Sequence, residues 1–415
     1  MEKQIKVSVV MPVYNAGEYL SRAISDVLSQ TLSELELICV DDGSTDNSHD
    51  IIKRFAAKDK RVRVIREKNA GPSVARNSGL KSAKGKYVIF LDADDFYEKN
   101  LLSELYHTAE RDNLDVAVTK FDIYNEERNA FVSSTEELHG IIFVQGCDTS
   151  KSEHPDFILS STTGYVWNKL FKAPFLKAKA LVFDPELYVF EDVCFVASAL
   201  ALAERVGRIE GNLIHHRVYS DQSRARLFRK YYGHVPFVYK KLKKFLMARG
   251  MYIPLKKGFL NLSAGRCFKI YNLLWAEGKE ELWNMLHDEY VHELEWLTHD
   301  KSAFESAEVC EFVANVALYT HAEYLERTDK GMSIVVDELE ENEISDKVQK
   351  NQKISKRRDG WHKFTDFINI YKKKKKKKND RSLGRFLSLK CITGAFLRSA
   401  RKLWGMRWAF FLFYL

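Results

Sequence analysis

The stretch KGKYVIFLDADDF, residues 84–96, ends an apolar run in three carboxylates, Asp92, Asp94 and Asp95. Residues 87–91 of this run are apolar enough to form a buried strand. Two like charges about 4 Å apart repel each other by roughly 4 kcal/mol at an effective dielectric constant near 20. The cluster therefore indicates that a cation binds where the strand ends.

The flanking sequence alternates between strand and helix patterns. Buried strands are predicted at 7–14, 35–42, 62–66 and 86–94. Between the first two, apolar residues recur at helical spacing from Ala23 to Leu28, with Asn15 as the predicted N-cap of that helix. This alternation predicts an α/β fold in which helices wrap a parallel sheet.

Polar side chains follow several of these predicted strands. In sheets of this kind, ligands bind beyond the carboxyl ends of the strands. We therefore expect one edge of the sheet to carry Tyr14, Asn15, Asp41, Asp42, Asp92 and Asp94. The alternative is that the carboxylates only cap the helices that follow them.

The spacing within the acidic cluster favours a metal-bridged ligand. Asp92 and Asp94 are two residues apart, so in strand geometry they point the same way. Mg²⁺ and Mn²⁺ prefer oxygen ligands, and Mg²⁺ commonly retains positions for substrate phosphates. The residues thus predict a phosphorylated ligand held through a divalent metal. The third carboxylate, Asp95, is expected simply to start the next helix.

Six motifs occur in an order and spacing that resemble family 2 glycosyltransferases. They are SVVMPVYN, VDDGSTDNS, NAGPSVARNSGL, GKYVIFLDADD, VWNKLF and FEDVCF, and the likeness covers about residues 5–225. The resemblance implies a GT-A fold, which is a Rossmann-like nucleotide-binding sheet flanked by helices. It also implies an inverting, metal-dependent transfer of a sugar from a nucleotide diphosphate, with UDP favoured.

The resemblance implies roles for individual residues. Tyr14 would stack on the base, Asp42 would accept a hydrogen bond from the base, and Asp94 would bind Mn²⁺ or Mg²⁺. Arg76 would lie near the nucleotide, although it could instead be an arginine on a helix surface. The implied nucleotide-sugar-binding set is Pro12, Tyr14, Asp41, Asp42, Arg76, Asp92 and Ala93, and the metal set is Asp94, Asp92 and His215.

Inversion requires a base on the acceptor side of the sugar. The segment YVFEDVCF, residues 188–195, supplies Glu191 and Asp192 between apolar runs. The family pattern implies that Asp192 is the base, and Glu191 is expected to orient it. The alternative is that both acids only stabilise the first turn of a helix that begins at Val193.

Two further side chains have competing interpretations. Trp167 in GYVWNKLFK could offer an apolar face to the acceptor sugar, or it could pack in the core. His215 in IHHRVYSDQSRAR could bind the metal, or it could be an ordinary packed histidine. The arginines of RARLFRK, residues 224–230, could contact phosphates.

The remainder of the chain divides by composition. A GT-A domain is predicted at 1–225, a helical accessory domain at 226–335, a charged linker at 336–380 and a basic amphipathic tail at 381–415. The linker contains seven consecutive lysines at 372–378. On a helical wheel of 386–404, apolar and basic residues separate into two arcs, which is typical of an interfacial helix. The segment WAFFLFYL that follows is too short to span a bilayer.

The charge distribution predicts a partner for the tail. Residues 350–415 contain 20 Lys and Arg against 3 Asp and Glu, whereas the rest of the chain contains 45 basic and 54 acidic residues. A basic amphipathic tail favours attachment to an anionic membrane surface. A solvated linker and a tail packed on the protein are the alternatives. Nucleic acid is disfavoured as a partner because no nucleic-acid-binding module accompanies the lysines.

Cysteine usage and the N-terminal sequence predict the compartment. The six cysteines form no C-x-x-C pair, which indicates reduced thiols rather than zinc ligands or disulfides. The first residues, MEKQIKVSVVMPVYN, do not resemble a signal peptide. We therefore expect a protein of the cytoplasm, held by its tail at the cytoplasmic face of the cell membrane.

The predicted function is hexosyl transfer to a hydroxyl of a lipid-linked glycan or a surface-polysaccharide precursor. A sugar nucleotidyltransferase is disfavoured because the loop PVYNAGEYL has one glycine and no basic residue for a phosphate. A membrane-associated scaffold with an inactive GT-A fold is the non-enzymatic alternative.

Overall fold

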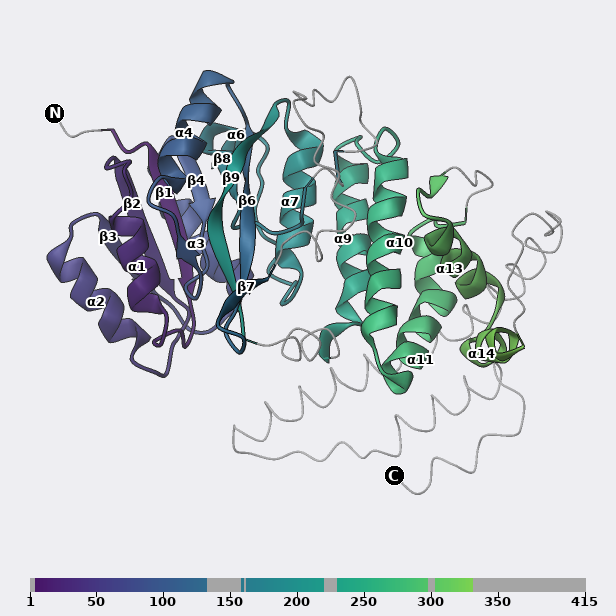
Figure 1. Cartoon of the computed structure of the whole chain (residues 1–415). Helices are drawn as coiled ribbons and strands as arrows, with labels where there is room; N and C mark the ends of the chain where they lie inside the picture. The colour runs from purple at the N-terminus through teal and green to yellow at the C-terminus, as the bar shows by residue number, and fades with distance from the viewer. Residues whose placement is uncertain (1–3, 133–157, 160–161, 220–229, 298–302, 331–415) are drawn as a thin grey trace, which may run out of the picture. The chain divides into compact units, whose positions relative to one another are not determined.

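A mixed β-sheet forms the centre of the N-terminal part of the computed structural model (Figure 1). The structure describes residues 4–132, 158–159, 162–219, 230–297 and 303–330. Within these residues the sheet has nine strands, of which eight follow the order β3-β2-β1-β4-β8-β6-β9-β5 and the ninth, β7, pairs with β6. The strands are β1 Val7–Val13, β2 Leu35–Asp41, β3 Val62–Arg66, β4 Tyr87–Phe90, β5 Phe96–Tyr97, β6 Val116–Asn125, β7 Ala130–Val132, β8 Lys169–Lys172 and β9 Val206–Val218.

The first four strands are parallel, as the alternating sequence predicted. β1 pairs with β2 on one side and with β4 on the other, and β2 pairs with β3. The other half of the sheet is mixed: β8 is antiparallel to both β4 and β6, while β6 and β9 are parallel. The predicted α/β class is confirmed, and the antiparallel half is an addition to it.

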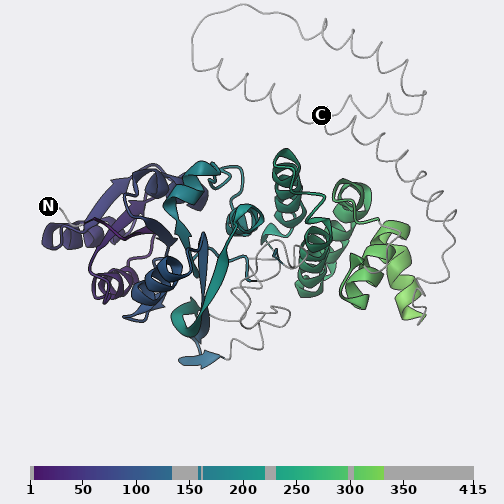
Figure 2. The same cartoon turned by 90° about the horizontal axis from the view of Figure 1, so that it is seen from above.

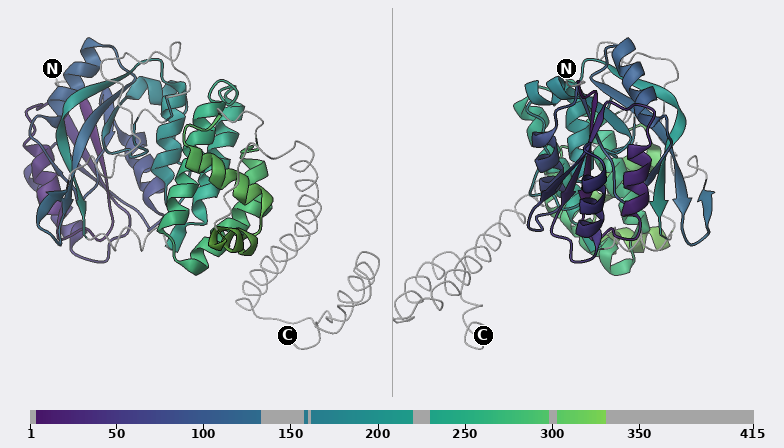
Figure 3. Two further views of the ribbon diagram at one scale, coloured as in Figure 1. Left: turned by 45° about the vertical axis from the view of Figure 1, so that its right-hand side comes forward. Right: turned by 90° about the vertical axis from the view of Figure 1, so that its left-hand side faces the viewer.

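Helices cover both faces of the sheet because buried residues alternate along the strands (Figures 2 and 3). Val9 and Met11 of β1 pack in one cluster with α1, α2 and α4, whereas Val10 packs in another with α6 and α7. Helix α3 lies against β1 and β2. The helices are α1 Leu20–Leu28, α2 Ser48–Lys58, α3 Pro72–Ser82, α4 Leu101–Arg111, α6 Ala173–Ala178 and α7 Glu191–Leu202.

The start of α1 corrects one prediction. The helix begins at Leu20 and its N-cap residue is Tyr19, so Asn15 is not the cap. Asn15 has a positive φ of 50°, a conformation that asparagine tolerates better than most residues. Its side-chain oxygen accepts hydrogen bonds from the backbone N–H of Thr45 and of Asp46, at 2.8 and 3.3 Å. Asn15 therefore joins the loops after β1 and β2 instead of starting a helix.

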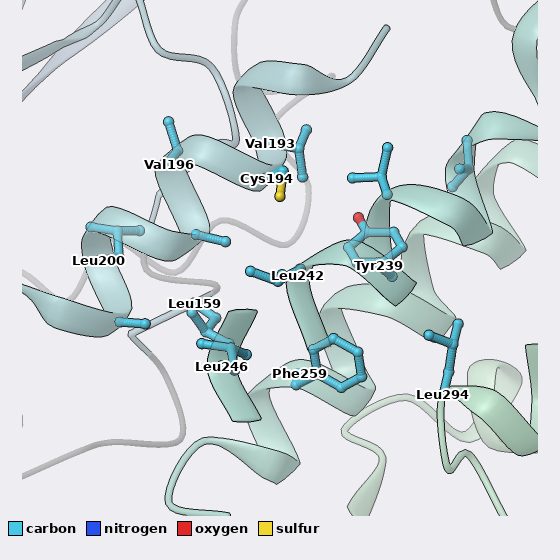
Figure 4. Packing of buried hydrophobic residues seen from close by; sticks show 14 of the residues in the cluster. Leu159, Val193, Cys194, Val196, Leu200, Tyr239, Leu242, Leu246, Phe259 and Leu294 are labelled. Atoms are coloured by element: carbon cyan, nitrogen blue, oxygen red, sulfur yellow. The ribbon is translucent and has the colours of Figure 1, made fainter. Parts of the chain in front are cut away.

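The region after β9 is helical where the structure describes it. It contains α9 His234–Ala248, α10 Lys256–Leu273, α11 Ala276–Met285, a π-helical segment Leu286–Tyr290, α12 Val291–Glu293, α13 Ala307–Leu318 and α14 His321–Asp329. Helix α9 packs along α7, and both contribute to one apolar cluster. Figure 4 shows this cluster, in which Tyr239 of α9 and Phe259 of α10 meet edge to face. Within the described ranges, no helix combines the length and apolarity needed to cross a bilayer.

Several sequence predictions concern residues that the structure does not describe. These are the arginines of 224–229, the charged linker at 336–380 with its lysine run, and the amphipathic tail at 381–415. The predicted boundaries between domains stay predictions.

Candidate active site

The acidic residues after β4 form the centre of the site. Asp92 and Asp94 are half-buried, and burial raises the pKa of both carboxyls. For Asp94, the nearby carboxylates of Asp95 and Asp92 act in the same direction, and the pKa reaches about 6. For Asp92, the guanidinium of Arg76 opposes the effect of burial. The cluster is thus a place where an added cation would stabilise the ionised carboxylates.

Asp95 has a different role from the one predicted. It does not start a helix, because β5 begins at the next residue and α4 begins only at Leu101. Its buried carboxylate accepts a hydrogen bond from the backbone N–H of Arg217 at 2.8 Å and lies 3.1 Å from Nδ1 of His216. Asp95 therefore fastens the acidic turn to β9.

Arg76 links the acidic turn to a distant helix. From α3, its Nη2 donates to Oδ1 of Asp92 at 3.1 Å, and its Nη1 donates to Oε1 of Glu191 at 2.6 Å. Burial alone would lower the pKa of this guanidinium, but the carboxylates of Asp92, Glu191 and Asp192 raise it overall. Arg76 is buried inside the site, so it is not an arginine on a helix surface.

Asp192 lies in the first turn of α7, where its Oδ1 accepts a hydrogen bond from the N–H of Val193 at 2.8 Å. Burial raises its pKa to about 7, the negative charge of Glu191 adds to this, and Arg76 opposes it. The preceding residue, Phe190, has a positive φ of 58°, so the chain turns sharply into the helix. A carboxyl group with a pKa near neutrality is suited to accepting a proton.

The predicted nucleotide-binding residues lie at the carboxyl ends of β1 and β2. Pro12 is next to Val40 in the parallel register, and Tyr14 follows β1 with 53% of its surface exposed. The two carboxylate oxygens of Asp42 accept hydrogen bonds from the N–H of Ala70 and of Gly71, at 2.8 and 2.9 Å. Asp42 therefore holds the loop that leads into α3.

Asp41 has no exposed side-chain surface. Its Oδ1 accepts a hydrogen bond from the N–H of Ser44 at 2.8 Å, and its Oδ2 lies 2.9 Å from Nδ1 of His49 and 3.3 Å from Nε of Arg66. This carboxylate is occupied by the protein. In this arrangement Asp41 shapes the loop after β2 and does not present an oxygen to a nucleoside. Ala93, predicted in the same set, is buried between Asp92 and Asp94.

The structure does not bring His215 to the acidic turn. Its Nε2 lies 3.0 Å from Glu98 and its ring packs 4.9 Å from the ring of Phe96. Neighbouring residues of a strand point to opposite faces, so His216 is the histidine that meets Asp95. The packed-histidine interpretation of His215 therefore fits, and its assignment as a metal ligand is corrected.

Trp167 is a core residue. Only 3% of its surface is exposed, and its ring stacks with Tyr165 and with His216 at centroid distances of 4.9 Å each. An acceptor sugar has no face of this ring available in the present arrangement. The core interpretation of Trp167 is thus the one that the packing supports.

The carboxylates of the acidic turn suit a metal ion that the substrate also helps to bind. Among the described residues, no three His, Cys, Asp or Glu side chains are grouped as a metal site. The acidic turn offers Asp92 and Asp94, each half-buried with a raised pKa. Mg²⁺ is commonly bound through one or two carboxylates together with substrate phosphates and water. Two carboxylates therefore fit a cation that arrives with a diphosphate.

Three residues of the site were not assigned from the sequence. The Tyr219 hydroxyl donates to Oδ2 of Asp94 at 3.1 Å, and Nε of Arg217 donates to the carbonyl oxygen of Asp94 at 2.9 Å. Lys169 is buried, and the negative charge of Asp192 acts on it. A lysine inside the apolar strand pattern of VWNKLF was the one available signal for Lys169. Tyr219 and Arg217 lie in the segment IHHRVYSDQSRAR that the sequence singled out, but their contact with Asp94 joins residues far apart in the chain.

Comparison with known proteins shows which glycosyltransferases the chain is similar to. Residues 8–165 match the sequence model of Glycosyl transferase family 2. The uncharacterized glycosyltransferase EpsJ of Bacillus subtilis is 32% identical over 212 residues, which cover 51% of this chain and 60% of EpsJ. The cholesterol galactosyltransferase of Borreliella burgdorferi is 31% identical over 212 residues, which cover 48% and 57% of the two chains. The chain thus spans less than two thirds of the length of these relatives.

A solved structure supports the same fold. Residues 1–349 of TarS from S. aureus, in complex with UDP-GlcNAc, superpose with a TM-score of 0.62 at 20% sequence identity. The superposition covers 79% of this chain and 92% of the TarS chain. Residues 8–165 of this chain thus match glycosyltransferase family 2 in sequence, and the described part of the chain has a GT-A-like fold.

Proposed function

We propose that this chain transfers a sugar from a UDP-sugar to an acceptor hydroxyl, with inversion at the anomeric carbon. The observation that carries the proposal is the pair of hydrogen bonds from Arg76 to Asp92 and Glu191. These bonds bring the acidic turn after β4 together with the first turn of α7, where Asp192 lies. A donor-side carboxylate and an acceptor-side base thereby share one site.

The comparisons support a nucleotide-sugar donor. TarS was solved with UDP and with UDP-GlcNAc, and the Borreliella relative is named a galactosyltransferase. Because these two names point to different sugars, the proposal extends to the UDP group and leaves the sugar open. Tyr14 is exposed and able to stack on a base, and the Asp42 oxygens each keep a lone pair for a base N–H.

The donor end of the site would act by neutralising charge. Asp94, with Asp92, would hold Mn²⁺ or Mg²⁺, which supplies Lewis-acid stabilisation of the departing diphosphate. Tyr219 and Arg217 keep the Asp94 side chain and backbone in place through their hydrogen bonds. Arg76 keeps the Asp92 carboxylate oriented and offsets its repulsion with Glu191.

The acceptor end would act by removing a proton. The Asp192 carboxylate takes the proton of the acceptor hydroxyl as the acceptor oxygen bonds to the anomeric carbon. The bond from that carbon to the diphosphate oxygen breaks with its electron pair, and UDP leaves on the opposite side. The pKa of about 7 leaves much of Asp192 ionised at neutral pH while keeping it basic enough to accept a proton.

The proposed acceptor is a lipid-linked glycan or a surface-polysaccharide precursor, and the proposed location is the cytoplasmic face of the membrane. Both rest on the basic, amphipathic composition of residues 350–415. A chain ending at residue 330 is expected to lose binding to vesicles that contain anionic lipid while keeping turnover of a soluble donor. Flotation of both chains with anionic and with neutral vesicles tests this. Equal flotation of the two chains would refute the role of the tail.

The function itself is tested by UDP release from purified protein. UDP-glucose, UDP-galactose, UDP-GlcNAc and UDP-GalNAc are each incubated with the full chain, with and without Mn²⁺. Asp94→Ala and Asp192→Asn are the test variants, and Asp112→Asn is the control because Asp112 is paired with Arg111 outside the site. Slow hydrolysis of the donor reports on the site without requiring the natural acceptor.

The proposal expects metal-dependent release from one donor, with loss in Asp94→Ala and Asp192→Asn and full activity in Asp112→Asn. Removing a positioned base is expected to cost about 100-fold or more in rate. UDP binding in calorimetry without turnover of any donor would favour an inactive scaffold. Absence of both binding and turnover would refute the UDP assignment.

A further inference from the structure

Lys169 is a buried cation that the proposed function does not use. It begins β8, and its side chain has no exposed surface. Its Nζ donates to the carbonyl oxygens of Thr163 at 2.8 Å and of Tyr165 at 2.7 Å, and to Oδ1 of Asn168 at 2.8 Å. Three acceptors match the three N–H bonds of an ammonium group, whereas a neutral amine has only two. The arrangement therefore supplies an acceptor for each N–H bond of the charged form of the lysine.

The oxygens bound by Lys169 belong to the turn at 163–168, and this turn presses on α7. A Cβ atom added to Gly164 would lie 2.8 Å from Cγ2 of Val193 and 3.3 Å from its Cα. Val193 follows Asp192 and donates the backbone hydrogen bond that the Asp192 carboxylate accepts. Lys169 thus holds in place the backbone of the 163–168 turn, which packs against the first turn of α7.

The turn is also tied to the sheet, which makes it a rigid support. Nδ2 of Asn168 donates to the carbonyl oxygen of Thr119 at 2.9 Å, and the Thr119 N–H donates to the carbonyl oxygen of Asn168 at 3.0 Å. The Lys169 ammonium therefore joins three oxygens of a segment that β6 already anchors. A side chain held by its neighbours in this way can fix a functional group to a fraction of an ångström.

Lys169 also contributes charge to the surroundings of Asp192. Burial lowers the pKa of Lys169 to about 7, and the negative charge of Asp192 opposes that effect. Groups from several elements act on Asp192 or respond to its charge. They are Glu191 of α7, Arg76 of α3, Asp92 after β4, Lys169 of β8, Tyr239 of α9 and Arg266 of α10.

We propose that Lys169 is a positioning residue for the acceptor side of the site, which holds the 163–168 turn against the first turn of α7, where Asp192 lies. This inference rests on the proposed function, because it assigns a supporting group to the same base. Lys169 itself would contact neither the donor nor the acceptor. The donor end would be independent of it, since Asp94 and Asp42 are held by other residues.

The test compares Lys169→Met with Lys172→Met in the full chain. Lys172 lies on the same strand, but its Nζ donates to the exposed side chain of Asn113. Each variant is assayed for UDP affinity by calorimetry, for kcat and KM of UDP release across pH, and for Tm. Lys169→Met is expected to bind UDP within about twofold of the unchanged protein.

The expected loss is in kcat, by about 10-fold or more, because the base is less well positioned. Loss of the cation also raises the pKa of Asp192, so the acid limb of the kcat profile moves to higher pH. A merely structural lysine would lower Tm without moving that limb. Lys172→Met is expected to match the wild-type protein in every measurement.

Gly164→Ala is the second variant, for the case that Lys169→Met does not fold. It leaves Lys169 intact but pushes the turn away from Val193, so the same loss of kcat with unchanged UDP affinity is expected. The inference is overturned if Lys169→Met keeps full kcat and an unmoved acid limb. If the lysine variant unfolds, full activity in Gly164→Ala overturns it instead. If the wild-type protein turns over no donor, the proposed function is overturned as well. If the wild-type protein is active, failure of the Lys169 inference leaves the proposed function standing.

Discussion

Asp92 and Asp192 are distant in the chain, and Arg76 is the residue that makes them parts of one site. Its two nitrogens reach Asp92 and Glu191, the neighbour of Asp192, so a single buried cation offsets the repulsion between these two carboxylates. Removing one member of a buried ionic network leaves uncompensated charge, which is more costly than replacing the whole network.

Arg76→Met is therefore expected to lower the free energy of unfolding by about 3 kcal/mol, because Asp92 and Glu191 then face each other without their cation. Urea denaturation at neutral pH measures this loss. Arg111→Met is the control, since Arg111 forms an exposed pair with Asp112 and should leave stability almost unchanged. Equal stability of the two variants would contradict the bridging role of Arg76.

Asp192 should make stability depend on pH. Its folded-state pKa is about 7, well above the ordinary value of 3.8 for an aspartic acid, so the folded protein keeps this proton to a higher pH than the unfolded chain. The contribution of the Asp192 proton to the free energy of unfolding is fully present below the unfolded-state pKa. It is lost as the pH rises through about 7. In Asp192→Asn this side chain no longer titrates, so the variant does not lose that stability as the pH rises. Its stability relative to the unchanged protein should therefore rise by roughly 2 kcal/mol between pH 5 and pH 8.

Urea unfolding of Asp192→Asn at the two pH values gives the measurement. Asp112→Asn, which alters an exposed carboxylate, serves as the control and should show no comparable change between them. A stability difference that is the same at both pH values would mean that Asp192 does not hold its proton in the folded protein.

At the scale of elements, α3 owes its position to one glycine. A Cβ atom on Gly79 would lie 2.3 Å from Cγ1 of Val10 on β1, so the helix can lie against the sheet only without a side chain there. This close approach matters for the site because α3 carries Arg76.

Gly79→Ala is expected to destabilise the protein by about 1–3 kcal/mol through overpacking. Gly265→Ala is the matched control, because Gly265 is also inside a helix but an added Cβ has nothing within 4 Å. That variant should be neutral or stabilised by up to about 1 kcal/mol, as alanine favours helix. Thermal melts of both variants decide the point, and equal Tm values would show that the helix can shift.

Strand pairing decided which histidine reaches the acidic turn. The sequence offers His215 and His216 as neighbours, and nothing local distinguishes them. The pairing of β9 with β5 and β6 turns His215 toward Glu98 and His216 toward Asp95. A shift of one residue in register would exchange these roles, because side chains alternate along a strand.

At the scale of the whole molecule, the helices after β9 complete the core of the GT-A sheet. Helix α7 is buried along nearly its full length, and α9 supplies part of the apolar surface that covers it. We therefore expect the helical region to stabilise α7.

A chain ending at residue 330 is expected to unfold cooperatively at a Tm close to that of the full chain. A chain ending at 219 should aggregate, because it exposes the apolar surface of α7. In the full chain, Leu242→Ala should lower the free energy of unfolding by about 2–5 kcal/mol. Leu242 of α9 is fully buried in the apolar cluster that α9 shares with α7. Lys244→Ala on the exposed side of α9 is the control. A monomeric 1–219 chain with a cooperative melt would show that the two regions fold independently.

Local sequence patterns were sufficient for the parallel half of the sheet and for the acidic edge. Apolar runs of the right length and the helical spacing between them depend only on neighbouring residues, so β1 to β4 and the helices between them could be predicted. The placement of Tyr14, Asp42, Asp92 and Asp94 at strand ends follows directly from those strands. The family resemblance added Asp192, which no local pattern distinguishes from a helix-capping acid.

The tertiary structure alone decided which side chains face the site. Asp41 is enclosed by His49 and Arg66, Trp167 is enclosed by Tyr165 and His216, and Lys169 is buried against the carbonyl oxygens of Thr163 and Tyr165. Each of these outcomes depends on the pairing of segments that are distant in the chain. Whether a side chain is open to a ligand is a property of the side chains packed around it, and local periodicity does not contain that information.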